Sequence, residues 1–334
     1  MNTDTVSNER LIGYRLIALW VVCETLLGGI IHSFNLPFSS ILLSGSSVIC
    51  ICLLAKVTGK GGILKATVIV VLFKFLLSPQ TPPAAYLAVF MQGIFGEVFF
   101  SSVRNYKISC VLVGIFSLAE SAIQRIIILL ILFGNDFPKA INKFVQSAFS
   151  KNVNTNYSMY LASLYVLIHI IMGGLIGYFA FSIWQKNTSS GHAFRLDMYI
   201  PETDQEKVKK KNKKTKWWLL VIWIILVALL IYSWIFPANR IFSPRSILLM
   251  LIRSVIILLT WYLFLSPVLL FYFKKWVEKK KQKLHGEIQE IILLLPATKY
   301  VIKQSWVNSS GKKGIKRILL CCRIIAYNTL LPGK

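Results

Sequence analysis

Residues 157–184 read YSMYLASLYVLIHIIMGGLIGYFAFSIW and contain no Lys, Arg, Asp or Glu. An apolar helix of about 20 residues crosses the hydrocarbon core of a bilayer, and inside lipid only a helix satisfies its own backbone polar groups. The stretch therefore predicts a membrane-spanning helix. Its small residues Gly173 and Gly177, one turn apart, predict that a second helix approaches this one closely.

Apolar runs of the same kind occur along most of the chain, each closed by Lys or Arg or by Pro, Asn and Gly. Hydrophobic residues make up 55% of the sequence, which leaves room for short links and a modest tail but for no sizeable aqueous domain. The pattern predicts an all-α integral membrane protein with eight spans: Leu11–Ser33, Ser39–Ala55, Ala66–Leu77, Ala84–Val103, Ile108–Phe133, Tyr157–Trp184, Trp217–Phe236 and Ser246–Phe273.

Polar links divide the chain into four predicted parts. Residues 1–185 hold six spans in one membrane domain, and residues 186–216 form a basic cytoplasmic linker. Residues 217–273 form a two-span membrane unit, and residues 274–334 form a basic, amphipathic, helical cytoplasmic tail. The link between spans five and six carries apolar residues at helical spacing and is expected to lie along the membrane interface; these residues are Phe137, Ile141, Phe144, Val145 and Phe149.

The formal net charge of +25 comes from Lys and Arg that cluster beside the ends of the spans. Nucleic-acid sites instead interleave basic with exposed aromatic residues, so we expect no nucleic-acid partner. The links after spans two, four, six and eight are basic, which by the positive-inside rule predicts a multi-pass protein of the plasma (inner) membrane with both termini in the cytoplasm. The basic flanks are expected to contact anionic lipids of the inner leaflet.

Motifs that would indicate an enzyme or a metal site are missing from the sequence. It has no HExxH, no GxSxG, no Walker-type phosphate loop and no paired-Asp motif. We therefore expect no catalysis, no metal, no cofactor and no energy source in this chain. The cysteines form no CxxC pair and predict no disulfide framework; they are Cys23, Cys50, Cys52, Cys110, Cys321 and Cys322.

Polar residues inside the spans are the candidates for function. An ionisable group at membrane depth costs at least about 2.5 kcal/mol on insertion scales, so each one requires a partner, a cavity or a ligand. Arg15 and Arg253 lie near span ends and are interpreted as interface anchors. His169 lies at mid-span, which is more typical of a helix–helix hydrogen bond than of a ligand site. The others are Glu24, His32, Lys74, Gln92, Glu97, Glu120, Gln124 and Arg125.

The first part of the candidate site lies at the outer ends of spans one and three. His32 and Lys74 are close to these ends, next to the loops that carry Asn35 and Gln80. The two loops are therefore expected to border one extracellular pocket. The alternative interpretation of Lys74 is that its side chain snorkels to the outer surface.

Two polar residues of span four extend this candidate site. Gln92 and Glu97 are about 140° apart around the helix, so they cannot both face one small ligand. Gln92 is a direct candidate and Glu97 a deeper one. The alternative for Glu97 is a salt bridge to Arg104 or Arg125.

Span five carries a polar stripe. Glu120 and Gln124 share one face of the helix, Ser117 is in line with them, and Arg125 lies beside them. The stripe fits a substrate-binding surface. It fits equally well a buried network that ties helices together, and both alternatives remain open.

Two segments carry a resemblance to a known family: ETLLGGIIHSFNLP at residues 24–37 and KFLLSPQTPPAAYLAVFMQGIFGE at residues 74–97. They resemble the substrate-binding S components of energy-coupling-factor (ECF) transporters, and the match covers about residues 10–185. The resemblance implies a six-helix bundle that captures a vitamin, a vitamin precursor or a metal from outside. It also implies partners, namely a membrane coupling subunit and two ABC ATPases that use ATP. His32, Asn35, Lys74, Gln80 and Gln92 would line the pocket, with Glu97 deeper.

Residues 217–334 weakly resemble the coupling (T) component of the same transporters. Cytoplasmic helices of that component carry Ala-Arg-Gly motifs that sit on the ATPases, whereas this tail has only Leu295-Pro296-Ala297 and the later Gly311 and Gly314. The alternative is an amphipathic basic tail that lies on the anionic inner leaflet.

Together these features predict a membrane uptake protein that binds a small nutrient for ATP-driven import by partner subunits. The mixed charges of the candidate pocket favour a zwitterion or a small anion. One alternative is a membrane enzyme acting on lipid-linked or isoprenoid phosphates, with Lys74 and Arg125 as anion clamps. The other is a non-transporting membrane scaffold whose polar stripe only holds helices together.

Overall fold

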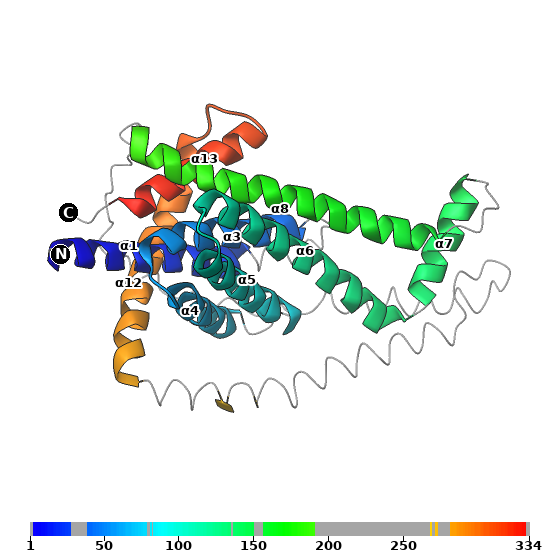
Figure 1. Ribbon diagram of the computed structural model, residues 1–334, viewed down its shortest axis with the longest axis horizontal. Helices are drawn as coiled ribbons and strands as arrows, with labels where there is room; N and C mark the ends of the chain where they lie inside the picture. The colour runs from blue at the N-terminus through cyan, green and yellow to red at the C-terminus, as the bar shows by residue number, and fades with distance from the viewer. Residues whose placement is uncertain are drawn as a thin grey trace, which may run out of the picture. The chain divides into compact units, whose positions relative to one another are not determined.

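The computed structural model describes residues 3–27, 39–78, 81, 83–134, 136–149, 156–190, 268, 271–272 and 281–331. Over these residues the chain is helical and contains no strand, as the sequence predicts (Figure 1). The elements are α1 (Thr3–Val22), the π-helix η1 (Cys23–Leu27), α3 (Ser39–Val57), α4 (Gly62–Leu77), α5 (Pro83–Ser102), α6 (Tyr106–Phe133), α7 (Asp136–Phe149), α8 (Tyr157–Ser190), α12 (Lys281–Asn308) and α13 (Ile315–Leu330).

Four of the described helices are long and apolar enough to cross a membrane. Their candidate spans are Ser40–Val57 in α3, Ala84–Ser102 in α5, Tyr106–Ile131 in α6 and Tyr157–Gln185 in α8. They match predicted spans two, four, five and six closely. The apolar runs therefore predicted both the position and the type of these helices.

The helices at predicted spans one and three do not meet the same criterion. With 16 residues, α4 is about 24 Å long, less than the roughly 30 Å of a hydrocarbon core. It is short because Gly61, with a left-handed φ of 79°, precedes it and a proline-rich sequence follows it. Predicted spans seven and eight lie almost entirely outside the described residues. The six-plus-two arrangement, the four-part division of the chain and the cytoplasmic termini remain predictions.

The chain forms two compact units. The first contains Met1–Arg125, Ser163–Met198 and Lys274–Lys334, and the second contains Ile126–Ala162 and Tyr199–Phe273. In the first unit α1 is central: Trp20 and the residues around it are buried, and α1 packs against α3, α4, α12 and α13. The core of this unit is therefore built around the N-terminal helix.

The second unit contains α7, which follows the end of α6 and precedes the start of α8. The rings of Phe133 and Phe137 stack, and the side-chain oxygen of Asn142 accepts a hydrogen bond of 2.7 Å from the backbone N–H of Ser158. The link predicted as an interfacial helix is thus helical, with Phe144 on its exposed side. Its position along the membrane interface remains a prediction.

Glycines allow α6 and α8 to touch through their backbones. A methyl group added at Gly173 would overlap the carbonyl oxygen of Gly114, and one added at Gly177 would overlap that of Cys110. Small residues permit this approach in membrane helices, where close packing stabilises helix pairs. The close approach expected for Gly173 and Gly177 is confirmed, and its partner is α6.

The two C-terminal helices pack onto the first unit. In Figure 1 α12 crosses α1, and the carbonyl oxygen of Leu331, just after α13, accepts a 2.7 Å hydrogen bond from the Arg15 guanidinium. Lys65 of α4 forms an ion pair of 2.6 Å with Glu287 of α12. Arg15 therefore binds the C-terminal segment through a hydrogen bond. Its interpretation as an interface anchor did not include this contact.

A pair of thiols in α13 gives a test of this packing. Burial raises the pKa of the Cys321 thiol, and it raises that of Cys322 to about 12 from an ordinary value of 9.0. At pH 9 an ordinary thiol is about half ionised, whereas Cys322 is ionised to about one part in a thousand. Because the thiolate is the reactive form, we expect iodoacetamide to modify Cys322 about 100-fold more slowly in folded protein than in denatured protein, as followed by mass spectrometry.

The same pKa shift sets the sign of a stability change. The folded state holds the Cys322 proton more tightly than the unfolded state, so its contribution to stability is complete below about pH 9 and is lost as the pH rises toward 12. Equal alkylation rates in folded and denatured protein at pH 9 would show that α13 is not packed as described.

Candidate functional site

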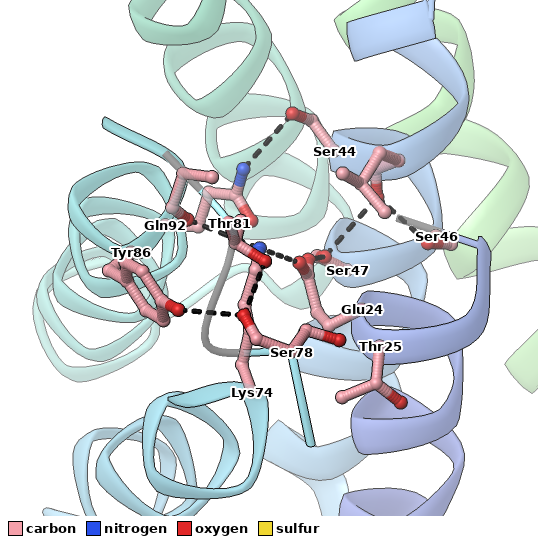
Figure 2. A network of polar contacts seen from close by, with 12 residues as sticks. Glu24, Thr25, Ser44, Ser46, Ser47, Lys74, Ser78, Thr81, Tyr86 and Gln92 are labelled. Carbon is pink, nitrogen blue, oxygen red and sulfur yellow. Dashed lines mark hydrogen bonds and ion pairs between the residues drawn. The ribbon is translucent and has the colours of Figure 1, made fainter. Parts of the chain in front are cut away.

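The centre of the candidate site is a buried ion pair between η1 and α4. The ammonium nitrogen of Lys74 lies 2.5 Å from Oε2 of Glu24, and each side chain is only 1% exposed (Figure 2). Taking two charges out of water costs several kcal/mol each, so such a pair persists only with close contact and further hydrogen bonds. Lys74 therefore does not snorkel to the surface, contrary to the alternative interpretation from the sequence.

Both partners of the ion pair have the further hydrogen bonds that burial demands. The hydroxyl of Ser47 on α3 donates to Oε1 of Glu24 over 2.5 Å. Lys74 donates to the carbonyl oxygen of Ala85 in the first turn of α5, 3.2 Å away. Four elements, η1, α3, α4 and α5, thus meet at this pair.

A second group of polar side chains extends from the same helices toward α6. The amide nitrogen of Gln92 on α5 donates to Oγ of Ser44 over 3.1 Å, and Ser44 is 2.7 Å from Oγ of Ser121 on α6. Ser121 in turn donates to the carbonyl oxygen of Ser117. The three side chains Ser44, Gln92 and Ser121 are all buried. Their hydrogen bonds form a chain that joins the helices α3, α5 and α6.

Several buried polar side-chain atoms have no hydrogen-bond partner among the described residues. On α5 and α6 they are Oε1 of Gln92, Oγ of Ser117, Oε2 of Glu120 and Nε2 of Gln124. Native proteins leave few buried polar atoms unsatisfied, and each one requires an explanation such as water or a ligand. The atoms include both acceptors and a donor. A small polar molecule could satisfy them.

Figure 2 shows how the two groups relate. Glu24 points toward Lys74 and Ser47 toward Glu24, whereas the amide of Gln92 reaches toward Ser44. Ser44 and Ser47 are both on α3, three residues apart, and so link the ion pair to the α5–α6 group. We call the whole set, Glu24, Ser44, Ser47, Lys74, Gln92 and Ser121, the buried polar cluster.

The structure places Glu97 away from this cluster. Its carboxylate accepts hydrogen bonds from the backbone N–H groups of Gly61 (2.6 Å) and Leu64 (3.2 Å) at the start of α4. Gly61 is the N-cap of α4 and has no side chain to cap it, so Glu97 from α5 satisfies the free N–H groups and complements the helix dipole. The expectation that Gln92 and Glu97 serve different surroundings is confirmed.

This capping role predicts a local effect of Glu97→Ala. Loss of a cap typically costs about 1 kcal/mol, so we expect the amides of residues 61–65 to exchange with deuterium about fivefold faster, with little change elsewhere. Glu97→Gln keeps one carbonyl oxygen as acceptor and is expected to show a smaller effect. Unchanged exchange in the alanine variant would exclude the capping role.

Of the remaining predicted site residues, some lie outside the described residues and the others are on α6. His32, Asn35 and Gln80 lie outside the described residues. Glu120 and Gln124 carry the unsatisfied atoms given above, and Arg125 is on the next position of the same helix. Whether any of these residues binds a substrate remains a prediction.

His169 is a helix–helix hydrogen bonder, as its mid-span position predicted. Its Nε2 lies 2.9 Å from Oγ of Ser40 on α3, and its Nδ1 lies 2.9 Å from the carbonyl oxygen of Tyr165 within α8. It is fully buried. This histidine therefore joins α8 to α3.

Sequence reasoning did not include Glu24, Ser44, Ser47 or Ser121 in the candidate site. Glu24 was recognised as a charge within a span, but it was not paired with Lys74. One signal could have found the pair, because Lys74 needs a carboxylate at matching depth and Glu24 is the acidic residue of the first run. The serines carry no such signal, since Ser is common in apolar helices.

No family model, curated protein or solved structure matches this chain. The chemistry of the cluster therefore has to be judged from its geometry. Paired charges, hydroxyls and an amide with a free acceptor can bind and orient a polar solute.

Proposed function

We propose that this protein is a multi-pass plasma (inner) membrane protein that captures a small polar solute for import. The proposal is supported by four helices able to cross a membrane and by a buried polar cluster formed by residues of η1, α3, α4, α5 and α6. Buried charges in membrane helices mark solute or ion pathways by default, because their cost is otherwise uncompensated. The role is binding rather than catalysis.

The observation that carries the proposal is the free acceptor of Gln92. Its side chain is 2% exposed, its amide nitrogen is bonded to Ser44, and its amide oxygen has no partner. Leaving a buried acceptor unpaired costs about 1–3 kcal/mol, which a solute carrying an N–H or O–H group would recover on binding. Ser117 on α6 adds a hydroxyl whose oxygen also has no partner among the described residues.

The charges of the cluster restrict the solute class. Glu24 and Lys74 neutralise each other, so a solute with a large net charge would leave one charge uncompensated inside the membrane. A zwitterion with hydrogen-bond donors, which carries no net charge, fits best. We propose that release toward the cytoplasm depends on partner subunits of the ECF type, a coupling protein and two ABC ATPases, since this chain has no nucleotide-binding motif.

The experiment is a mild-detergent affinity purification of the tagged full-length protein, followed by mass spectrometry of co-purifying proteins and small molecules. Recovery of an ABC ATPase pair together with a retained polar solute supports the uptake proposal. A solute without ATPases supports binding and contradicts the transporter assignment. Protein that is pure and empty, and whose Gln92→Met variant is clearly less stable, favours the scaffold alternative.

A further inference from the structure

The two C-terminal helices expose apolar residues at the surface of the described part of the protein. On α12, Ile292, Pro296, Lys299, Lys303 and Val307 are all exposed, and they follow each other at three- and four-residue spacing. This spacing places them on one side of the helix. One outward face of α12 therefore carries both apolar and basic residues.

The helix α13 and the residues just before it also expose apolar and basic side chains. Ile315 is 75% exposed and Ile318 is also exposed, while Lys312, Lys313 and Lys316 stand around them. No Asp or Glu occurs in α13. The exposed residues of α12 and α13 named here are called the basic apolar face.

The opposite sides of both helices are fixed by the first unit. Ile291 and Ser305 of α12 are fully buried, as is most of the second half of α13. The acidic residues of α12, Glu287 and Glu290, lie on other sides of the helix, and Glu287 pairs with Lys65. The basic apolar face therefore lies on the side away from the packed residues, and neither of the acidic residues of α12 and α13, Glu287 and Glu290, lies on it.

A second observation concerns the level of α13 relative to the ends of the apolar helices. Lys56 at the end of α3 lies 4.1 Å from the ring centre of Tyr106 and 5.8 Å from that of Trp184. Trp and Tyr beside Lys at the ends of apolar helices are typical of a membrane interface. The Arg323 guanidinium of α13 lies 5.8 Å from the ring centre of Phe179, five residues before Trp184 on α8. The helix α13 thus packs beside the part of α8 that carries Phe179 and Trp184.

We propose that the basic apolar face lies on the anionic lipid headgroups of the membrane that α3, α6 and α8 cross. Its apolar side chains enter the headgroup boundary, and its lysines contact lipid phosphates while their stems lie along the apolar surface. In water, exposed apolar residues such as Ile315 and Leu293 would form a patch prone to association. The inference rests on the membrane placement in the proposed function and does not depend on solute binding.

The test uses the full-length protein in nanodiscs of phosphatidylcholine alone or with about 30% phosphatidylglycerol, a composition whose negative surface attracts basic residues. The variant Ile315→Cys introduces a thiol on the face, and Asn308→Cys introduces one at an exposed position off it. Labelling by a membrane-impermeant maleimide is followed at each position by peptide mass spectrometry. We expect phosphatidylglycerol to slow labelling at position 315 at least fivefold and to leave position 308 unchanged.

Charge removal completes the test. Replacing Lys299, Lys303, Lys312 and Lys316 by Gln in the Ile315→Cys protein should abolish the effect of phosphatidylglycerol, because the lysines supply the attraction. Equal rates at position 315 in the two lipids, whether fast or slow, overturn the proposal. Protection that persists without lipid and disappears when a co-purifying protein is removed also overturns it, since the face would then bind a protein. Failure of the purification experiment above affects only the uptake proposal.

Discussion

Replacing Lys74 by methionine is expected to lower the free energy of unfolding by about 3–5 kcal/mol, because Glu24 would remain charged and buried without a partner. The two side chains are each 1% exposed and 2.5 Å apart, so water cannot replace the lost ammonium. The measurement is thermal or denaturant unfolding of the purified protein in mild detergent. The methylene stem of methionine keeps most of the packing volume.

The chain offers a matched control on the same helix. Lys65 also pairs with a glutamate at 2.6 Å, but its side chain is 49% exposed, and exposed pairs contribute at most about 1 kcal/mol. Lys65→Met should therefore have a small effect. The double variant Glu24→Gln with Lys74→Met should recover most of the loss, since no uncompensated charge remains. Equal effects of Lys65→Met and Lys74→Met would show that the buried pair is not formed.

Gly173→Ala is expected to destabilise the protein by about 3 kcal/mol or to change the packing of α6 against α8. The new methyl group would overlap the backbone carbonyl of Gly114, and backbone atoms cannot move aside as a flexible side chain can. The measurement is the unfolding midpoint in detergent. Hydrogen exchange in α6 and α8 would show whether the helices separate.

The neighbouring glycine provides the control for this prediction. A methyl group at Gly174 would meet only side-chain atoms of Ile115, the nearest at 3.7 Å, which is an ordinary contact. Gly174→Ala is therefore expected to be neutral, or slightly stabilising because alanine favours a helix. If both substitutions destabilise to the same extent, the close crossing at Gly173 is not present.

Much of the helical architecture could be predicted from the sequence, because an apolar run in lipid has few alternatives to a helix. The runs at α3, α5, α6 and α8 predicted these helices to within a few residues. Gly173 predicted a close crossing, and His169 predicted a hydrogen bond between helices. Each of these predictions depends on residues that are near in sequence or on a single helix.

The sequence could not predict which helices are neighbours. Glu24 and Lys74 are both visible as charges within apolar runs, but helical periodicity defines faces only within one helix and gives no partner for a face. Glu97 is a further example, since its role depends on the start of α4 lying beside α5. A capping contact between two helices leaves no pattern in either of them.

The C-terminal segment is a further case in which the sequence did not predict the neighbouring helix. Its alternating apolar and basic residues predicted an amphipathic helix, but an amphipathic helix has two faces that can each find a partner. The structure shows that the face of α12 containing Ile291 is buried and that α12 packs against α1. The sequence had suggested only the lipid surface or a partner subunit for this segment.

The central claim is that the buried polar cluster binds a solute and does more than hold helices together. The most direct measurement is native mass spectrometry of wild-type and Gln92→Met protein, released from mild detergent, together with their unfolding midpoints. We expect the wild type to retain a small polar molecule and the variant to lose it without loss of stability, because methionine removes an unsatisfied buried acceptor. A variant that is clearly less stable, with no bound molecule in either protein, would contradict the account.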